Sequence, residues 1–293
     1  MEKITEGILE NGVHFVEACE IPYIDIFKTF DCGQCFRFDR VQMFGNKWEF
    51  GGVAFGKYVV FAQNSCNHII IYNSTRDEYE KIWRDFLSLS DDYDLINSHI
   101  SKTVKSEHMD KAIEKSNGIR ILKQDGWECI CSFIISQNNN IPRIKGIISR
   151  MCEKYGESVC FLDKTYYTFP TATALLEAGE GEIFNLKTGF RAKYIYDACQ
   201  AITEGRISIE GLKEKELDLC IEELCRIKGI GLKVSSCALL FGFNKTEAFP
   251  VDVWMKRALE KYFPQGFDYV ALGKSAGIAQ QYLFYYEKYI QNA

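Results

Sequence analysis

Residues 216–257 read ELDLCIEELCRIKGIGLKVSSCALLFGFNKTEAFPVDVWMKR, and this stretch decides the fold of the second part of the chain. Its first apolar side chains recur at i, i+3, i+4 and i+7, the spacing of an amphipathic helix. These side chains are Leu217, Cys220, Ile221 and Leu224. A second helix is expected to begin at about Leu232. The sequence therefore predicts a hairpin of two helices at about residues 216–242.

The turn of this hairpin contains Gly229 and Gly231. Because glycine adopts positive φ angles at little cost, the two helices can join within very few residues. The glycines also leave backbone N–H groups unpaired at the start of the second helix, where a phosphate can dock. An ordinary helical hairpin with a glycine-rich turn is the alternative, and the glycines alone would favour it.

Lys233 and Asp252 favour a catalytic site over an ordinary helical hairpin. Lys233 falls in the first turn of the second helix, where the positive end of the helix dipole disfavours an ammonium charge. A structural lysine is more usual near the C-terminus of a helix. Asp252 follows Pro250 among apolar neighbours. A cap for the next helix is the alternative role of this carboxylate.

Composition narrows the class of protein. The 293 residues are 47% hydrophobic and 26% charged, which is typical of a globular chain with about two domains. Lys and Arg number 35 against 40 Asp and Glu, so the net charge of -5 excludes a uniformly basic surface. No window approaches the roughly 18 apolar residues of a membrane span, and residues 1–7 lack the pattern of a signal peptide. We expect a cytoplasmic protein of bacterial type.

Twelve cysteines in such a chain are expected to be reduced. Cys32 and Cys35 form the one C-x-x-C spacing, for which a zinc or redox pair is the alternative to structural thiols. No second pair follows at zinc-ribbon spacing, and none of the four histidines is near in sequence. We expect no metal site.

The two parts of the chain differ in pattern and charge. Residues 1–118 hold 13 Lys and Arg and 19 Asp and Glu, a net of -6, whereas the remainder has a net of +1. Short β segments at 48–50, 58–61 and 68–72, separated by turn residues, predict an antiparallel sheet. Helices are expected at 80–89, 127–135 and 144–155. The predicted class is α+β, with a β-rich lobe at 1–117 and a larger all-helical domain at 118–293 that contains the hairpin.

The chain resembles the helix-hairpin-helix DNA glycosylases, and among them the 8-oxoguanine DNA glycosylase/AP lyases. Six blocks in the family's order carry this resemblance. They are residues 31–37 (DCGQCFR), 118–125 (GIRILKQD), 132–144 (SFIISQNNNIPRI), 189–194 (GFRAKY), 227–237 (IKGIGLKVSSC) with 250–253 (PVDV), and 276–284 (AGIAQQYLF).

The resemblance implies a base-excision repair enzyme that flips 8-oxoguanine, paired opposite cytosine, out of duplex DNA and excises it. Lys233 would attack C1′ and form a Schiff base, which also permits cleavage on the 3′ side by β-elimination. Asp252 would stabilise the positively charged sugar in the transition state. The implied partner is double-stranded DNA containing oxidised guanine, bound by a monomer without a cofactor.

The resemblance also implies how the base is read. The carbonyl of Gly33 would accept the N7 hydrogen that 8-oxoguanine has and guanine lacks. Gln280 would read the Watson–Crick edge, and Phe284 and Cys237 would sandwich the ring. A plain turn glycine is the alternative for Gly33, and core packing is the alternative for Phe284 and Cys237.

The strand opposite the lesion would meet a second set of residues. Asn138 would fill the space left by the flipped nucleotide, and Arg143 and Arg191 would hydrogen-bond the orphaned cytosine. Phe190, where a tyrosine is usual, would wedge beside that base. A polar turn between helices is the alternative for Asn138.

Two residues depart from the family pattern. Trp254 stands where a histidine is common, which puts a phosphate contact in doubt because an indole offers a single donor. Lys228 replaces an apolar residue or proline and is expected to supply a compensating phosphate contact.

Three other functions remain as alternatives. A glycosylase for a different damaged base would act on adenine opposite the lesion or on alkylated bases. The first is expected to carry iron–sulfur cysteines near the C-terminus, but no cysteine follows Cys237, and the second lacks the lysine. The others are a non-catalytic helix-hairpin-helix DNA-binding protein and a thiol or metal protein.

Overall fold

The structure is a computed structural model that describes residues 2–291, and its chain forms two compact units. Unit 1 comprises the residues up to 52, 59–123 and those from 249 onward, and unit 2 comprises 53–58 and 124–248. The chain enters unit 2 after Lys123, close to the boundary expected between residues 117 and 118. It returns to unit 1 at Phe249. Unit 1 is therefore built from both ends of the chain, whereas the sequence predicts two contiguous domains.

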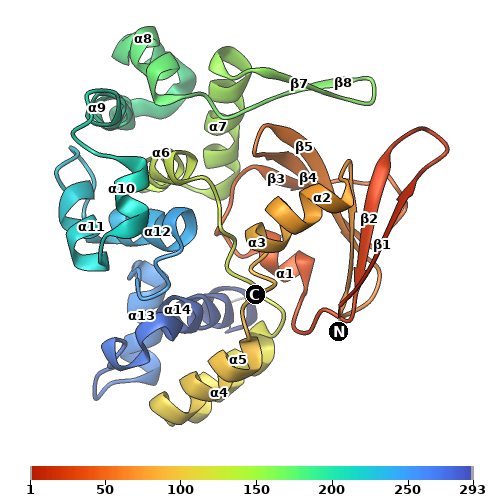
Figure 1. The fold of residues 1–293 in the computed structure, drawn as a ribbon. Helices are drawn as coiled ribbons and strands as arrows, with labels where there is room; N and C mark the ends of the chain where they lie inside the picture. Colours follow the sequence, from red (N-terminus) through yellow and green to blue (C-terminus); the bar gives the residue numbers. More distant parts are fainter. Residues whose placement is uncertain (1, 292–293) are drawn as a thin grey trace. The chain divides into compact units, whose positions relative to one another are not determined.

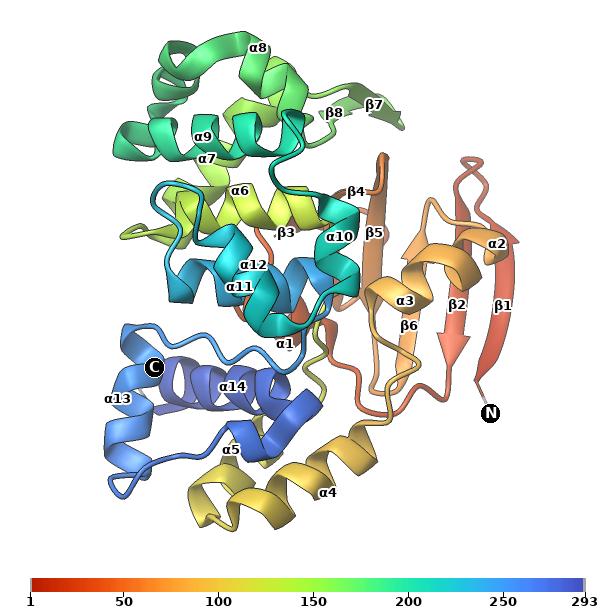
Figure 2. The ribbon, with the colours of Figure 1, turned by 60° about the vertical axis from the view of Figure 1, so that its left-hand side comes forward.

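A six-stranded sheet forms the β-rich part of the chain (Figures 1 and 2). Its strands, in the spatial order β1-β2-β6-β5-β4-β3, are β1 (Lys3–Ile8), β2 (His14–Cys19), β6 (His68–Tyr72), β5 (Lys57–Gln63), β4 (Trp48–Ala54) and β3 (Phe38–Arg40). The three predicted strands are confirmed as β4, β5 and β6, and the sheet is antiparallel as expected. Between β4 and β5, Phe55 and Gly56 have φ angles of 50° and 75°, as a two-residue hairpin turn requires.

Aromatic side chains fill the core beside the sheet. The Phe30 ring lies 5.1 Å from Phe61 and 4.8 Å from Phe38, and Trp83 meets Phe61 edge-on at 5.6 Å. Such offset and edge-to-face pairs add to the stabilisation from apolar burial. This packing holds α1 (Ile26–Asp31), which carries Phe30, against the strands.

The remaining helices of unit 1 come from both ends of the chain. They are α2 (Arg76–Glu78), η1 (Tyr79–Trp83), α3 (Arg84–Phe86), α4 (Tyr93–Val104), α5 (Glu107–Ser116), α13 (Val253–Tyr262), η4 (Val270–Ser275), α14 (Ala276–Tyr285) and η5 (Tyr286–Gln291). The helix expected at 80–89 is the run α2–η1–α3, which begins and ends earlier because Thr75 forms a capping box with Glu78 and Leu87 closes the last turn. Helix α14 packs on α5 and α13 (Figure 1).

Unit 2 is built mainly of helices. Its elements are α6 (Gly126–Ser136), α7 (Ile141–Tyr155), β7 (Ser158–Phe161), β8 (Lys164–Tyr167), α8 (Ala172–Ile183), η2 (Phe184–Thr188), η3 (Gly189–Arg191), α9 (Ala192–Thr203), α10 (Ile209–Glu214), α11 (Leu217–Leu224) and α12 (Leu232–Phe243). The helices expected at 127–135 and 144–155 are confirmed as α6 and α7. The second begins earlier than expected because the Asn140 side chain caps it and Pro142 fits its first turn.

Two glycines let α6 and α12 approach each other closely. A Cβ atom on Gly126 would lie 2.5 Å from the Phe243 ring, and one on Gly242 would lie 2.7 Å from Cβ of Cys129. Neither position leaves room for a side chain, so this tight contact fixes α12 on a buried helix. Among residues 2–291, no helix combines the length and the hydropathy needed to cross a bilayer.

Candidate functional site

The predicted hairpin is present as α11, a seven-residue turn and α12. Gly229 has a φ of 79°, and a Cβ there would lie 2.4 Å from the ring of Tyr194. Gly231 has a φ of -113°, and a Cβ there would meet no atom within 4 Å. Only Gly229 therefore requires glycine for its conformation and its packing, whereas Gly231 uses backbone that other residues adopt.

The N-terminus of α12 is open. Gly231 is its N-cap residue and, having no side chain, makes no side-chain cap hydrogen bond. The first backbone N–H groups of a helix have no partner within the helix, and the N-cap residue supplies none here. The N–H of Lys228, just before this end, donates to Asp197 Oδ2 at 2.7 Å and so fixes the turn. An uncapped N-terminus of a twelve-residue helix is suited to a phosphate.

Lys233 lies half-buried in the first turn of α12. Its Nζ is 5.8 Å from the centroid of the Phe133 ring, which is buried and stacks on Phe241 at 5.5 Å. Cys237 follows four residues later on the same face of the helix and is 6% exposed. The structure thus places the expected nucleophile and one expected stacking residue one turn apart, on an apolar support.

Arg191 holds the loop between α6 and α7. It is 2% exposed, and its Nε and Nη2 donate to the carbonyl of Gln137, Nη2 also to that of Asn138, and Nη1 to that of Thr188. Burial, and then the nearby charge of Arg143, lower the pKa of Arg191. Contact with cytosine, as expected for Arg191, would require these hydrogen bonds to be exchanged, so that role stays a prediction.

Three expected DNA-contacting side chains surround this buried arginine at the surface. Asn138 is exposed and has a positive φ of 46°, and Arg143 is exposed in the first turn of α7. Phe190 is 49% exposed, with the guanidinium of Arg191 lying 4.4 Å from its ring centroid. Exposed aromatic and basic groups around a rigid loop are suited to contacts with bases and phosphates.

Unit 1 holds the other expected base-reading residues. Gly33 follows α1 with a φ of 84°, and its loop is anchored on both sides. The buried Gln34 donates to the carbonyls of Thr29 and Arg120 at 2.8 Å and accepts from the Leu122 N–H at 2.8 Å. Gln281 of α14 donates to the carbonyl of Cys32 at 3.1 Å. These hydrogen bonds place the Gly33 backbone beside α14.

Gln280 and Phe284 lie one turn apart on α14. A Cβ on Gly33 would be 3.9 Å from Cε1 of Phe284, so the glycine and the ring are neighbours. Gln280 is 5% exposed, and its Oε1 is buried without a hydrogen-bond partner among residues 2–291. A buried amide oxygen of this kind is an acceptor that a bound base with N–H donors can satisfy.

Asp252 caps α13 through Oδ1, which accepts the Met255 N–H at 2.8 Å. The capping role is therefore confirmed. Lys288 of η5 is also near this carboxylate: burial lowers the pKa of Lys288, and the charge of Asp252 opposes that effect. Trp254 is half-buried under the guanidinium of Arg257, at 5.3 Å from the ring centroid, and presents an aromatic surface where the family commonly has histidine.

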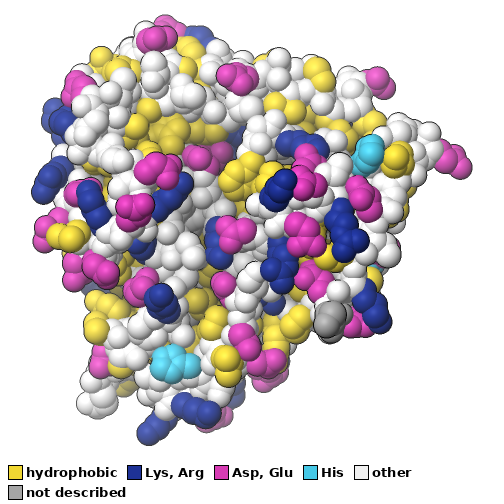
Figure 3. All heavy atoms as spheres, in the orientation of Figure 1, with side chains coloured by type: hydrophobic (Ala, Val, Ile, Leu, Met, Phe, Trp, Pro, Cys, Tyr) yellow, Lys and Arg dark blue, Asp and Glu magenta, His cyan; other side chains and the backbone are white. Residues whose placement is uncertain are grey.

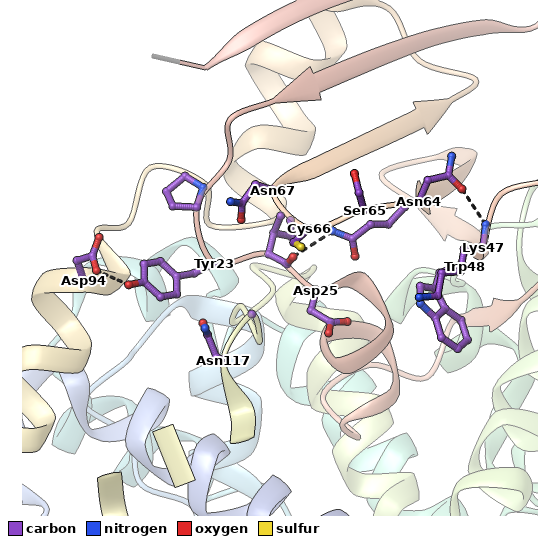
Figure 4. Close-up of a pocket in the computed structure, with 14 residues that line it drawn as sticks. Tyr23, Asp25, Lys47, Trp48, Asn64, Ser65, Cys66, Asn67, Asp94 and Asn117 are labelled. Carbon is purple, nitrogen blue, oxygen red and sulfur yellow. Dashed lines mark hydrogen bonds between the residues drawn. The ribbon is translucent and has the colours of Figure 1, made fainter. Parts of the chain in front are cut away.

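Acidic and basic side chains are intermixed on the face drawn in Figure 3, without a broad basic patch. A hollow of about 630 Å³ lies in unit 1, on the side of the β-rich lobe (Figure 4). None of the expected site residues lines it. Several of its polar groups are already paired, including Tyr23 with Asp94 and the Lys47 N–H with Asn64 at 2.9 Å.

One group of three metal-ligating side chains comes together within residues 2–291: Glu17, Cys19 and His68. His68 Nε2 already bonds Glu17 Oε1 at 2.6 Å. Cys32 and Cys35 are buried outside this group, and burial raises the pKa of Cys32 to about 12. A neutral buried thiol agrees with the structural interpretation of that pair.

The expected residues are divided between the two units. Lys233, Cys237 and the hairpin glycines belong to unit 2 with Asn138, Arg143, Phe190 and Arg191, whereas Gly33, Gln280, Phe284 and Asp252 belong to unit 1. Three residues that position the expected site residues are not predicted from the sequence. They are Gln34, Tyr194 and Gln281. All three stand inside the quoted blocks, but only their contacts reveal what they do.

Comparisons with known proteins agree with these features. Residues 18–130 match the family described as 8-oxoguanine DNA glycosylase, N-terminal domain. Residues 131–266 match that described as HhH-GPD superfamily base excision DNA repair protein. The N-glycosylase/DNA lyase of Saccharomyces cerevisiae is 28% identical over 260 residues, which cover 78% of this chain and 65% of the yeast protein. The chain spans 58% to 65% of the lengths of the first curated relatives that it matches.

Solved structures match over nearly the whole chain. The apo-form of Clostridium acetobutylicum 8-oxoguanine glycosylase/lyase is 35% identical with a TM-score of 0.87, over 97% of this chain and 98% of that one. The same enzyme in complex with double-stranded DNA containing cytosine opposite 8-oxoguanine gives 35% identity and a TM-score of 0.86, over 97% of each chain. The chain belongs to the 8-oxoguanine DNA glycosylases of the HhH-GPD superfamily of base excision DNA repair proteins.

Proposed function

We propose that the protein excises 8-oxoguanine opposite cytosine from double-stranded DNA and then cleaves the strand on the 3′ side of the abasic site. The observation that carries this proposal is Lys233, half-buried on an apolar support in the first turn of an uncapped helix. A lysine amine in this place can act as a nucleophile and form a Schiff base with a sugar carbon.

In the proposed reaction the Lys233 nitrogen forms a bond to C1′ while the bond from C1′ to N9 of the base breaks. The base leaves with the proton that the Lys233 amine gives up on bonding to C1′. Cleavage of the C1′–O4′ bond, with the second amine proton passing to O4′, then converts the sugar to a Schiff base. Removal of a C2′ proton then expels the 3′ phosphate by β-elimination, and water releases Lys233. Asp252 would stabilise the positive charge that develops on the sugar.

Base recognition is assigned to the group in unit 1. The carbonyl of Gly33 would accept the N7 hydrogen, which guanine lacks. The buried Oε1 of Gln280, which has no hydrogen-bond partner in the described part of the chain, would accept a hydrogen from the Watson–Crick edge, and Phe284 would stack on the ring. Cys237 would cover the other face of the base.

DNA binding is assigned to the hairpin and the loop after α6. The open N-terminus of α12, with Gly229 and Gly231, would bind a phosphate, to which Lys228 would add a charge. Asn138 would occupy the space of the flipped nucleotide, and Arg143, Phe190 and Arg191 would contact the orphaned cytosine. A monomeric state and a bacterial cytoplasmic location belong to the same proposal.

Borohydride trapping tests the nucleophile. A duplex with 8-oxoguanine opposite cytosine is incubated with the protein and borohydride, which reduces the Schiff base to a stable amine. Wild type is expected to give a covalent complex, and Lys233→Gln none. Lys81→Gln, which changes an exposed lysine paired with Asp77 at 2.8 Å, is the matched control and is expected to trap like wild type.

A covalent complex formed by Lys233→Gln would remove this lysine from the mechanism. A wild-type protein that binds the lesion duplex but leaves it uncut would instead favour a non-catalytic DNA-binding protein.

A further inference from the structure

We propose that the hydroxyl of Tyr289 reads the C8 oxygen of 8-oxoguanine, as a second lesion-specific contact beside Gly33. This inference rests on the proposed function and extends it to a residue outside the six sequence blocks. Tyr289 Oη is buried and has no hydrogen-bond partner among residues 2–291.

The position of this hydroxyl points to the lesion. A Cβ built on Gly33 would lie 4.0 Å from Tyr289 Oη and 3.9 Å from Cε1 of Phe284. The hydroxyl, the glycine and the expected stacking ring therefore meet at one place. In 8-oxoguanine, N7 and the C8 oxygen are on adjacent atoms. A base that donates its N7 hydrogen to Gly33 therefore brings its C8 oxygen close to this hydroxyl.

The ring of Tyr289 is held by its neighbours. It stacks on Tyr285 at 5.2 Å and lies edge-on to Phe284 at 6.4 Å. Nζ of Lys288 is 4.8 Å from the Tyr289 ring centroid and 5.0 Å from that of Phe284. A ring fixed on several sides presents its hydroxyl in a set direction, which a specific hydrogen bond needs.

The hydroxyl is also in the right protonation state. Burial, with the nearby Cys32 and Asp31, raises the pKa of Tyr289, so the group stays a donor at neutral pH. The C8 oxygen is an acceptor, whereas guanine has a C–H group there. Guanine in the same place would leave the hydroxyl buried and unpaired, and a site built to form a hydrogen bond rejects a ligand that cannot form it.

Gln280 supplies the matching feature at the other edge of the base. Its Oε1 is buried and, like Tyr289 Oη, has no hydrogen-bond partner among the residues that the structure describes, and it is an acceptor only. A flipped 8-oxoguanine offers N–H donors at its Watson–Crick edge and an acceptor at C8. Gln280 Oε1 thus complements the N–H donors of the Watson–Crick edge, and the Tyr289 hydroxyl complements the oxygen at C8.

The test combines one substitution with one change in the substrate. Tyr289→Phe keeps the ring and removes the hydroxyl. Single-turnover release is measured from duplexes with 8-oxoguanine or 8-thioguanine opposite cytosine, because sulfur keeps the N7 hydrogen but accepts hydrogen bonds poorly. We expect the ratio of the two rates to fall about tenfold from wild type to Tyr289→Phe, the size of one hydrogen bond.

Cleavage of a preformed abasic site is measured in parallel and is expected to be unchanged, since no base is present. Tyr286→Phe, three residues earlier in η5 and beside Tyr262, is the matched control and should keep the wild-type ratio. If the ratio of the two release rates is the same in wild type and Tyr289→Phe, this inference alone is overturned. The same holds if Tyr289→Phe slows release of both bases and cleavage of the abasic site by the same factor. A wild type that releases neither base overturns the proposed function and this inference with it.

Discussion

At the residue scale, one role of the Asp252 carboxylate is observed and a second is proposed, and one pair of substitutions separates them. It caps α13 by accepting the Met255 N–H, and it is proposed to stabilise the charged sugar. Asparagine caps helices about as well as aspartate, whereas alanine does not. We expect Asp252→Asn to leave the free energy of unfolding nearly unchanged and Asp252→Ala to lower it by about 1 kcal/mol.

Both variants are expected to lose base release by about a hundredfold, because neither carries the charge. Urea denaturation gives the first quantity, and single-turnover excision of 8-oxoguanine gives the second. If Asp252→Asn retained wild-type excision, the capping hydrogen bond would be the whole contribution of this residue.

Gly229 and Gly231 form a matched pair within one turn. Alanine at 229 would need a positive φ and would meet the Tyr194 ring, whereas alanine at 231 would meet neither obstacle. We expect Gly229→Ala to lower the free energy of unfolding by about 2–4 kcal/mol and Gly231→Ala to change it by less than about 0.5 kcal/mol. Similar losses in the two variants, measured by urea denaturation, would contradict this account of the turn.

At the scale of elements, the loop between α6 and α7 depends on one buried side chain. Arg191 satisfies carbonyls of Gln137, Asn138 and Thr188, whereas Arg143 is exposed. We expect Arg191→Met to lower the free energy of unfolding by about 2–4 kcal/mol, because it removes the hydrogen bonds to three carbonyls, of which that of Thr188 is buried. Arg143→Met is expected to change it by less than about 0.5 kcal/mol.

Both substitutions should weaken the preference for cytosine, Arg191→Met because the Asn138 loop loses its support and Arg143→Met because a direct contact is lost. Thermal unfolding and excision rates opposite each of the four bases check the two effects. If Arg143→Met kept the wild-type preference for cytosine opposite the lesion, the proposed contact between Arg143 and that cytosine would be wrong.

The elements differ in how far the sequence predicts them. Helices α6, α7, α11 and α12 carry a strong apolar pattern or clear end signals, so local information suffices. Strand β3 has three residues, and β1 is exposed or half-buried along its length, so neither shows a two-residue alternation. Their pairing depends on neighbours that lie far away in the sequence.

The residues of the site likewise divide into those that the local sequence predicts and those whose role depends on distant parts of the chain. Lys233, Gly33 and Gln280 stand in recognisable motifs, and the capping role of Asp252 follows from its local sequence. The support given by Arg191 to the Asn138 loop spans 53 residues, and that of Gln281 to Cys32 spans 249. Contacts over such separations depend on the folded chain and leave no local pattern to detect.

At the scale of the whole molecule, unit 1 joins the two ends of the chain. The hydrogen bond from Gln281 to Cys32 and the contact of Gly33 with Phe284 both link α14 to the segment after α1. The proposed base-reading group therefore exists only when the C-terminal helices have packed on the N-terminal part. A substitution in the segment after α1 is therefore expected to disturb the position of α14, and one in α14 to disturb that segment. Either substitution is expected to impair recognition of the base.

Charge sets how strongly the proposed binding to DNA depends on salt. The net charge is -5, and acidic and basic groups are intermixed on the face drawn in Figure 3. Binding through a helix N-terminus and a few placed Arg and Lys neutralises few phosphates, and each contributes a slope of about -0.9 in log K against log salt. With about four phosphate contacts, affinity should fall about a hundredfold between 50 and 200 mM salt.

Fluorescence anisotropy with a lesion duplex measures this slope, in the Lys233→Gln background so that the strand stays intact. Lys228→Gln is expected to make the slope shallower by about one, because this side chain is proposed to meet a phosphate. Lys81→Gln, on the β-rich lobe, should leave it unchanged. An affinity that falls more than about ten-thousandfold over the same range would require about seven or more phosphate contacts, nearly twice the number expected for the hairpin and its few basic neighbours.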